Sequence, residues 1–141
     1  MIVVAPLRKL EKREVHLFLI KSSPLYIEPW YGADLDGTLA VTTGDETIGD
    51  PIWPVVNQVK QWVAQGKRVK VFTARVWSDG SLERDQRVAE ARTAIFDWTL
   101  KWIGVPLSAT NEKDPGMVQF LDDKAISIQK DTGLPNGWEI F

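Results

Sequence analysis

Short apolar runs alternate along the chain with longer segments in which apolar residues recur at helical spacing. Residues 31–35, 69–73 and 118–121 have the length and the residue types of buried strands. Between these runs, the apolar positions of residues 52–63 and 88–102 each fall on one helix face. Strands that alternate with helices predict an α/β fold, with a central parallel sheet between two helical layers in a three-layer sandwich.

Glycines and turn residues mark where these elements are expected to end. Gly66 and Gly104 follow the two helical segments and are candidates for their C-terminal caps. Residues 39–51 are rich in Thr, Gly and Asp, which favours a small hairpin or an irregular loop. The short apolar runs 105–107 and 125–128 are further candidate strands.

The first thirty residues give a weaker pattern than the rest of the chain. Residues 15–20 fit either a strand or part of a helix, and a Ser-Ser-Pro break follows at residues 22–24. We therefore interpret residues 1–29 as an N-terminal appendage and residues 30–141 as one folded domain.

The composition is that of an ordinary globular chain. It has 141 residues, of which 44% are hydrophobic and 26% charged, which fits a single packed domain. No apolar run approaches the roughly 20 residues that cross a bilayer. The apolar residues 1–6 meet Arg8 and Lys9 too soon for a signal peptide. We expect a soluble, cytoplasmic protein with no membrane partner.

Charge and residue types restrict the chemistry. The net charge of -2 provides no overall positive field for a nucleic acid, although a local basic patch remains an alternative. The chain has no Cys, and His16 is its only His, which excludes thiol nucleophiles and Cys/His zinc sites. Any metal must then be held by oxygen atoms, as Mg2+ is.

Polar and acidic residues follow three of the expected strands. Asp34 and Asp36 close the first, Thr73 the second, and Asp122 and Asp123 the third. Each group alone is unremarkable, since Asp-Gly after an apolar run is a common turn signal. Parallel strands, however, bring their carboxyl ends to one edge of the sheet. Four carboxylates gathered there repel one another unless a divalent cation and a basic residue offset their charge.

These residues resemble the ordered motifs of the haloacid-dehalogenase-like (HAD) phosphohydrolase superfamily. The resemblance spans about residues 31–128, and the order of the motifs makes it more specific than any one of them. It implies a Rossmann-like α/β catalytic domain. The motifs are Asp34-Leu35-Asp36-Gly37-Thr38-Leu39, Thr73 after an apolar strand, Lys113, and Asp122-Asp123.

The resemblance implies a role for each acidic residue. Asp34 would be the nucleophile that forms an aspartyl-phosphate intermediate, and Asp36 would be the acid and then the base. Mg2+ would bind the Asp34 carboxylate, the Asp36 backbone carbonyl and Asp122. Asp123 would be a further ligand or a partner of one.

The resemblance also assigns residues to the phosphoryl group. Thr73 and Lys113 would bind it and assist catalysis, with Ala74 and Arg75 beside Thr73 as further substrate contacts. A Lys in an Asp-Pro-Gly turn is more often a solvated residue. Lys124, next to the acidic pair, is therefore the alternative to Lys113.

The spacing of the motifs leaves no room for a cap domain between them. The site is expected to be open, shielded at most by residues 39–51. It would then suit either a macromolecular phosphoester or a small phosphoester enclosed by homo-oligomerisation.

The expected function is Mg2+-dependent hydrolysis of a phosphomonoester. One alternative is a nucleotide or nucleic-acid 3′-end phosphatase, which the basic groups around Lys12-Arg13 and Lys67-Arg68 support and the net charge opposes. Another, from a different class, is a non-catalytic metal-binding module with a regulatory or assembly role.

Overall fold

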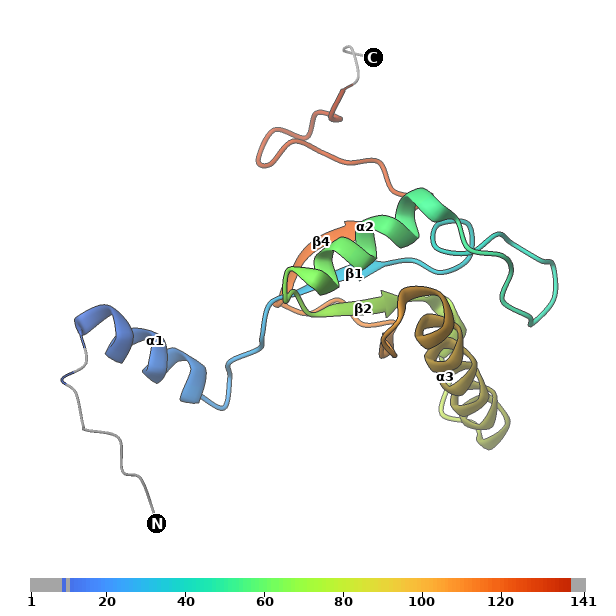
Figure 1. The fold of residues 1–141 in the computed structure, drawn as a ribbon, viewed down its shortest axis with the longest axis horizontal. Coiled ribbons are helices and arrows are strands. Elements are labelled where there is room, and N and C mark those ends of the chain that lie inside the picture. Colours follow the sequence, from blue (N-terminus) through green and yellow to red (C-terminus); the bar gives the residue numbers. More distant parts are fainter. Residues whose placement is uncertain (1–8, 10, 138–141) are drawn as a thin grey trace.

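The computed structural model describes residue 9 and residues 11–137 of the chain. It contains helices, four strands and one 3₁₀ turn (Figure 1). In chain order these elements are α1 (Lys12–Ser22), β1 (Trp30–Ala33), α2 (Trp53–Ala64), β2 (Val69–Phe72), η1 (Ala74–Val76), α3 (Leu82–Ile103), β3 (Ala109–Thr110) and β4 (Met117–Leu121).

All four strands lie parallel in one sheet, in the order β3-β2-β1-β4. Ala33 at the end of β1 pairs with Val71 on one side and with Leu121 on the other, so these strands end at one edge. The predicted α/β class and parallel sheet are confirmed. The run 105–107 is not a strand and precedes β3, while residues 125–128 contribute only a single bridge, from Ile128 to Pro135.

The two long helices pack into one core on one face of the sheet. Their buried side chains enter a single apolar cluster with Ala33, Val69 and Val71. The predicted helix ends are confirmed at both glycines. Gly66 follows the end of α2 with a positive φ of 77°, and Gly104 caps α3 in the left-handed conformation. The helix residues of the cluster are Val56, Val59 and Trp62 of α2 and Ile95, Trp98 and Ile103 of α3.

The opposite face of the sheet carries an aromatic layer. Phe72 stacks near Trp30 and packs edge-on against Phe120. A Cβ on Gly32 would lie 3.0 Å from the Trp30 ring and 3.2 Å from the Phe120 ring, so glycine allows the two rings to pack closely against β1. The described part of the chain places no helix here, in contrast to the expected second helical layer. The reason is that β3 and β4 are joined by residues 111–116 alone, too few for a crossover helix.

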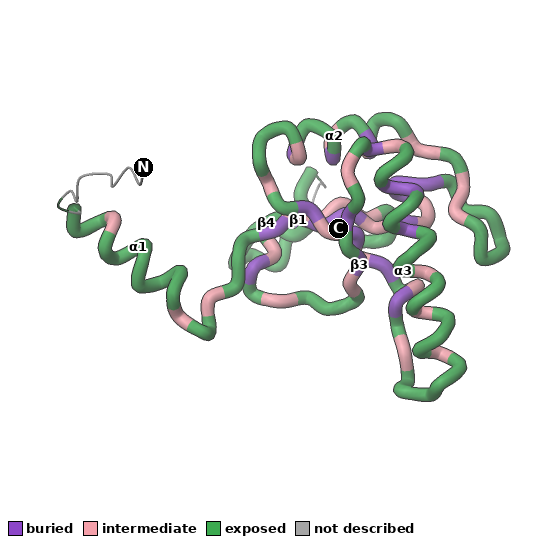
Figure 2. Tube along the Cα trace, turned by 60° about the horizontal axis from the view of Figure 1, so that its bottom comes forward, coloured by how far each residue is buried: buried purple, intermediate pink, exposed green. Residues whose placement is uncertain are grey.

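The helix α1 stands apart from this body, with none of its residues buried (Figure 2). Residues 15–20 lie within α1, so the helical alternative for them is confirmed. Apolar side chains such as Phe18 and Leu19 are exposed along it. None of the described helices combines the length and the apolar character needed to cross a membrane.

Thr99 holds the end of α3 to the segment that follows it. Its hydroxyl is fully buried, donates to the carbonyl oxygen of Ile95 and accepts the backbone N–H of Leu107 at 2.9 Å. We predict that Thr99→Val, which keeps the shape, lowers the free energy of unfolding by about 1–3 kcal/mol because the Leu107 N–H loses its partner. Urea unfolding measures this.

Thr93→Val on the same helix is the matched control, since the Thr93 hydroxyl makes a similar bond to Ala89 but is exposed. This variant should change the free energy of unfolding by less than about 0.5 kcal/mol. Equal losses in the two variants would contradict the role assigned to Thr99.

Candidate functional site

A tight turn after β1 presents the first two acidic residues. Leu35 and Leu39 are fully buried and anchor the turn in the core. Backbone hydrogen bonds close it, from Ala40 N–H to the Leu35 carbonyl at 2.9 Å and from Gly37 N–H to the Ala40 carbonyl at 2.8 Å. With its apolar residues directed inward, the turn leaves Asp34 and Asp36 at the edge of the sheet.

Three carboxylates converge at this edge. Asp34, Asp122 and Asp123 each offer a carboxylate oxygen, and these oxygens all lie within 4.8 Å of one another. The parallel pairing of β1 with β4 brings them together, since the Asp34 N–H donates to the Leu121 carbonyl at 2.8 Å. We call these three residues the acidic cluster.

Gly37 allows the acidic cluster to close. Its φ is 86°, a conformation that residues with a Cβ rarely adopt. A Cβ at this position would also lie 2.8 Å from a carboxylate oxygen of Asp123. The Asp-Gly pair in the first motif is thus both a turn and a close approach between two segments.

Asp34 and Asp123 of the acidic cluster have pKa values shifted in opposite directions. Burial raises the pKa of Asp34 from 3.8 to about 7, and its hydrogen bond with Asp123 and the charge of Asp122 add to this. The pKa of Asp123 is lowered, first by the hydroxyl of Thr38, which donates to it at 3.0 Å, and then by the bond with Asp34. Asp34 therefore holds a proton more tightly than Asp123 does when no cation is bound.

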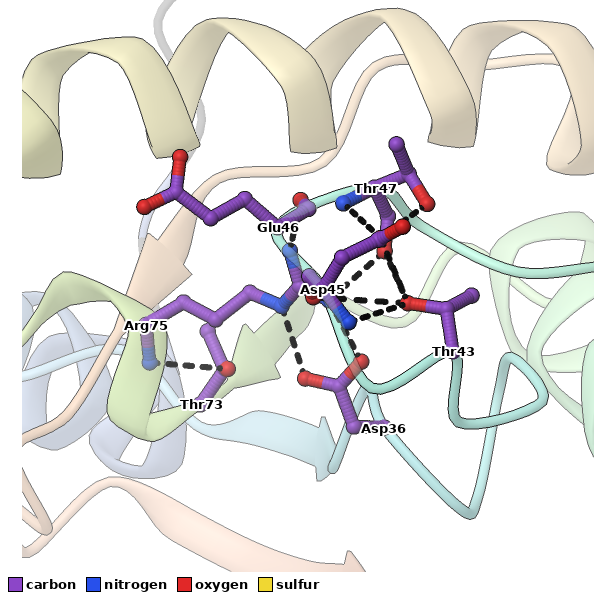
Figure 3. Close-up of polar contacts among 7 residues, drawn as sticks. All are labelled: Asp36, Thr43, Asp45, Glu46, Thr47, Thr73 and Arg75. Atoms are coloured by element: carbon purple, nitrogen blue, oxygen red, sulfur yellow. Dashed lines mark hydrogen bonds and ion pairs between the residues drawn. The ribbon is translucent and has the colours of Figure 1, made fainter.

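Asp36 does not join the acidic cluster through its side chain. Arg75 grips both of its carboxylate oxygens, with Nε and Nη2 each donating at 2.7 Å (Figure 3). Two parallel hydrogen bonds of this kind hold a carboxyl group in one plane relative to the guanidinium. The Asp36 side chain is thus fixed beside the acidic cluster rather than in it, and its backbone carbonyl is the atom left for a cation.

Arg75 also ties residues 42–49 to the site. Nη1 donates to the Glu46 carbonyl at 2.6 Å, and Nη2 donates to the Thr47 carbonyl at 3.0 Å. The base of this loop is held as well, because the Trp98 indole N–H donates to the Gly49 carbonyl at 3.0 Å. Residues 39–51 combine the two predicted alternatives, because an antiparallel bridge joins Ala40 to Pro51 while residues 42–49 between them form an irregular loop. We call residues 42–49 the flap.

Thr73 and Ala74 lie where the end of β2 meets η1. Thr73 is 2% exposed, and its hydroxyl accepts the backbone N–H of Arg75 at 3.2 Å. Ala74 is exposed at the start of η1. Both residues stand at the same edge as the acidic cluster, although no hydrogen bond joins them to it in the described part of the chain.

The two candidate lysines lie in different places. Lys113 is exposed in the β3–β4 connection and makes no hydrogen bond or ion pair with any described residue. Its neighbour Asp114 accepts the Trp30 indole N–H at 2.7 Å, which holds this connection near the start of β1. Lys124 directly follows the acidic pair, and its charge helps to lower the pKa of Asp123.

The acidic cluster has the chemistry of a hard-cation site. Its donors are carboxylate oxygens alone, which Mg2+ prefers. A bound cation would favour the ionised form of Asp34, whose proton is otherwise held by burial and by its acidic neighbours.

Sequence reasoning missed two partners in this site. It treated Arg75 as a substrate contact, whereas Arg75 pairs with Asp36. It gave Thr38 no role, whereas the Thr38 hydroxyl bonds Asp123. The sequence did contain a signal for the pairing of Arg75 with Asp36, because Arg75 follows β2 and Asp36 follows the adjacent strand β1.

We predict that the stability of the metal-free protein depends on pH through Asp34. The folded protein keeps this proton up to a pKa of about 7, and the unfolded chain releases it near 3.8. Stability from the neutral form is therefore full below pH 3.8 and is lost as the pH rises to about 7. Thermal unfolding in EDTA should show Asp34→Asn losing less stability than the unmutated protein over this range.

Asp97→Asn on the exposed side of α3 is the control, and its pH profile should follow that of the unmutated protein. Excess Mg2+ should raise the melting temperature of the unmutated protein at pH 7, because a ligand that binds only the folded state stabilises it. Identical profiles for Asp34→Asn and the unmutated protein would contradict the assignment.

Comparisons with known proteins add no assignment. No protein-family model, no curated protein and no solved structure matches this chain. The function therefore has to be argued from the site itself, which consists of the acidic cluster, the Asp36–Arg75 pair beside it and the flap that Arg75 holds.

Proposed function

We propose that the protein is a Mg2+-dependent phosphomonoester hydrolase of the HAD-like type, acting through an aspartyl-phosphate intermediate. The observation that carries this proposal is the acidic cluster at the carboxyl edge of a parallel sheet, with a second, separately held carboxylate two residues after Asp34. Nucleophile and acid/base chemistry need two such groups in different environments.

The order of the strands supports the proposal. Asp34 follows the central strand β1, Thr73 follows β2, and Asp122 follows β4 on the other side of β1. A phosphoryl group placed over the end of β1 would thus have polar groups on both sides. This is the arrangement that the HAD-like motifs imply.

A cation would be held by Asp34, Asp122 and the backbone carbonyl of Asp36, with Asp123 as a further ligand or as a partner of one. When bound, Mg2+ would neutralise charge between the anionic nucleophile and the anionic substrate. The raised pKa of Asp34 gives a reason for this requirement, because a nucleophilic carboxylate has to be ionised.

Asp34 and Asp36 would divide the reaction between them. A carboxylate oxygen of Asp34 attacks phosphorus, and the bond between phosphorus and the ester oxygen breaks. Asp36 in its acid form gives a proton to the departing alcohol oxygen. It then takes a proton from the water that hydrolyses the acyl phosphate.

Arg75 would keep Asp36 in place for both steps. It holds the two carboxylate oxygens in a fixed plane at 2.7 Å. The Arg75 side chain is 19% exposed and the Asp36 side chain is 33% exposed, so the pair is only partly accessible to solvent. A group that takes up and releases a proton in turn needs this partial access to water.

We predict that Asp34→Asn abolishes both turnover and phosphoryl transfer to the protein, because an amide cannot attack phosphorus. Asp36→Asn keeps the nucleophile and should lower turnover by about 10²–10⁴-fold through loss of the acid and base. With a substrate whose leaving group needs little protonation, phosphoenzyme should accumulate in Asp36→Asn. Rapid acid quenching and mass spectrometry detect it.

Asp131→Asn, an exposed carboxylate outside the site, is the control and should keep full activity. Phosphate found on Asp36 in the unmutated protein, or full activity in Asp34→Asn, would overturn the assignment. Stabilisation by Mg2+ without turnover of any phosphoester would favour a non-catalytic metal-binding module.

We further predict that Lys124→Ala lowers turnover more than Lys113→Ala does. The ammonium group of Lys124 lies close enough to act on the pKa of Asp123, whereas Lys113 contacts none of the described residues of the site. Steady-state kinetics with one substrate compare the two variants directly. A larger loss of turnover in Lys113→Ala would show that Lys113, the lysine that the motif order assigns, is the one that acts on the phosphoryl group.

A further inference from the structure

A cavity of about 500 Å³ opens next to Asp36, between the flap and the first half of α3. Asp36 and Arg75 form one end of it, and Arg84, Arg87 and Ala91 on α3 lie along its side. Cavities of roughly 300–1,000 Å³ commonly hold small-molecule ligands. Nothing in the phosphoryl chemistry described above uses this space.

The flap is fastened across the cavity at several points. Arg75 donates to the carbonyls of Glu46 and Thr47, and Arg87 forms an ion pair with the Glu46 carboxylate at 3.1 Å. Within the flap, Asp45 accepts hydrogen bonds from Thr47 N–H and the Thr43 hydroxyl (Figure 3). The wall opposite α3 is therefore shaped before any ligand arrives.

The charges that line the cavity are largely matched. Arg75 pairs with Asp36, and Arg87 pairs with Glu46 and with Glu83. Glu90 lines the cavity and makes no hydrogen bond or ion pair with any described residue. The residues that line the cavity carry four carboxylates against three guanidinium groups, and of these guanidiniums that of Arg84 has no carboxylate partner among the described residues. A second anionic group on a ligand would therefore add to an excess of negative charge.

Unused donors and acceptors remain on the α3 side. Arg84 stacks on Trp77 and donates to its carbonyl at 2.8 Å, and its guanidinium forms no ion pair with any described residue. The carboxylate of Glu90 is an unused acceptor on the same helix. Hydroxyl groups can serve both, since each hydroxyl donates and accepts.

We propose that this cavity is the subsite for the alcohol portion of the substrate, and that the substrate is a small, polyhydroxylated phosphomonoester with no second anionic group. The inference rests on the proposed phosphatase function. Asp36 joins the two sites, because the oxygen that it protonates belongs to both the phosphoryl group and the alcohol. The size of the cavity between the flap and α3 favours a small alcohol portion over a macromolecular one.

The test fills the cavity and leaves the reacting groups intact. Ala91→Leu adds bulk to the α3 side of the cavity, and Ala89→Leu, exposed on the same helix outside this cavity, is the matched control. The substrates are acetyl phosphate, which lacks a polyol, and three monophosphates, namely ribose 5-phosphate, glucose 6-phosphate and glycerol 3-phosphate. Thermal unfolding verifies that both variants are folded.

We expect Ala91→Leu to lower kcat/KM for the best monophosphate by at least about tenfold and to leave acetyl phosphate within about twofold. Ala89→Leu should leave both unchanged. An equal loss for both substrates in Ala91→Leu, or an equal loss in the two variants, would overturn the subsite.

A second variant tests the charge argument if Ala91→Leu does not fold. Glu90→Gln should raise kcat/KM for fructose 1,6-bisphosphate relative to the monophosphates by about threefold or more, because the opposing carboxylate is gone. Preference of the unmutated protein for the bisphosphate or for a 3′-phosphorylated oligonucleotide would refute the substrate class and leave the phosphatase proposal standing. Absence of turnover with every substrate would refute the phosphatase proposal itself.

Discussion

Parallel pairing of β1 with β2 on one side and β4 on the other is the constraint on which the candidate site depends. The register aligns Ala33 with Val71 and Leu121, so the residues that follow the three strands emerge together. Because side chains alternate along a strand, a shift of one residue in either pairing would move the side chains of the shifted strand to the other face of the sheet. The turn that carries Asp34 is anchored in the core by the buried side chains of Leu35 and Leu39.

The same edge holds two carboxyl groups in different environments. Asp34 sits among other acids with its pKa raised, whereas Asp36 is gripped by a guanidinium. Their side chains are two residues apart in the chain but have different partners, because Arg75 reaches Asp36 from η1 and the residues after β4 reach Asp34. This separation allows one of the pair to attack and the other to move protons.

The flap depends on the same arginine. Its backbone carbonyls take the hydrogen bonds that Asp36 leaves free on Arg75, and the ion pair between Glu46 and Arg87 joins it to α3. The shape of the cavity and the position of the proposed acid and base are therefore linked through one side chain. A change in the conformation of the flap would alter the position of the Asp36 carboxyl group, because both are hydrogen-bonded to the Arg75 guanidinium.

The sequence by itself determined the α/β class, the parallel sheet, the ends of α2 and α3, and which strands close with acidic residues. These features follow from local periodicity, from glycine caps and from the residue types at the strand ends, each of which is encoded within a few neighbouring residues. Only the tertiary structure decided that Asp36 pairs with Arg75, that Asp114 accepts the indole N–H of Trp30, and that an aromatic layer covers the second face. The partners Asp36 and Arg75 are 39 residues apart, and Trp30 and Asp114 are 84 apart. Contacts at such separations are set by strand register and by the length of the connections, which local sequence patterns do not specify.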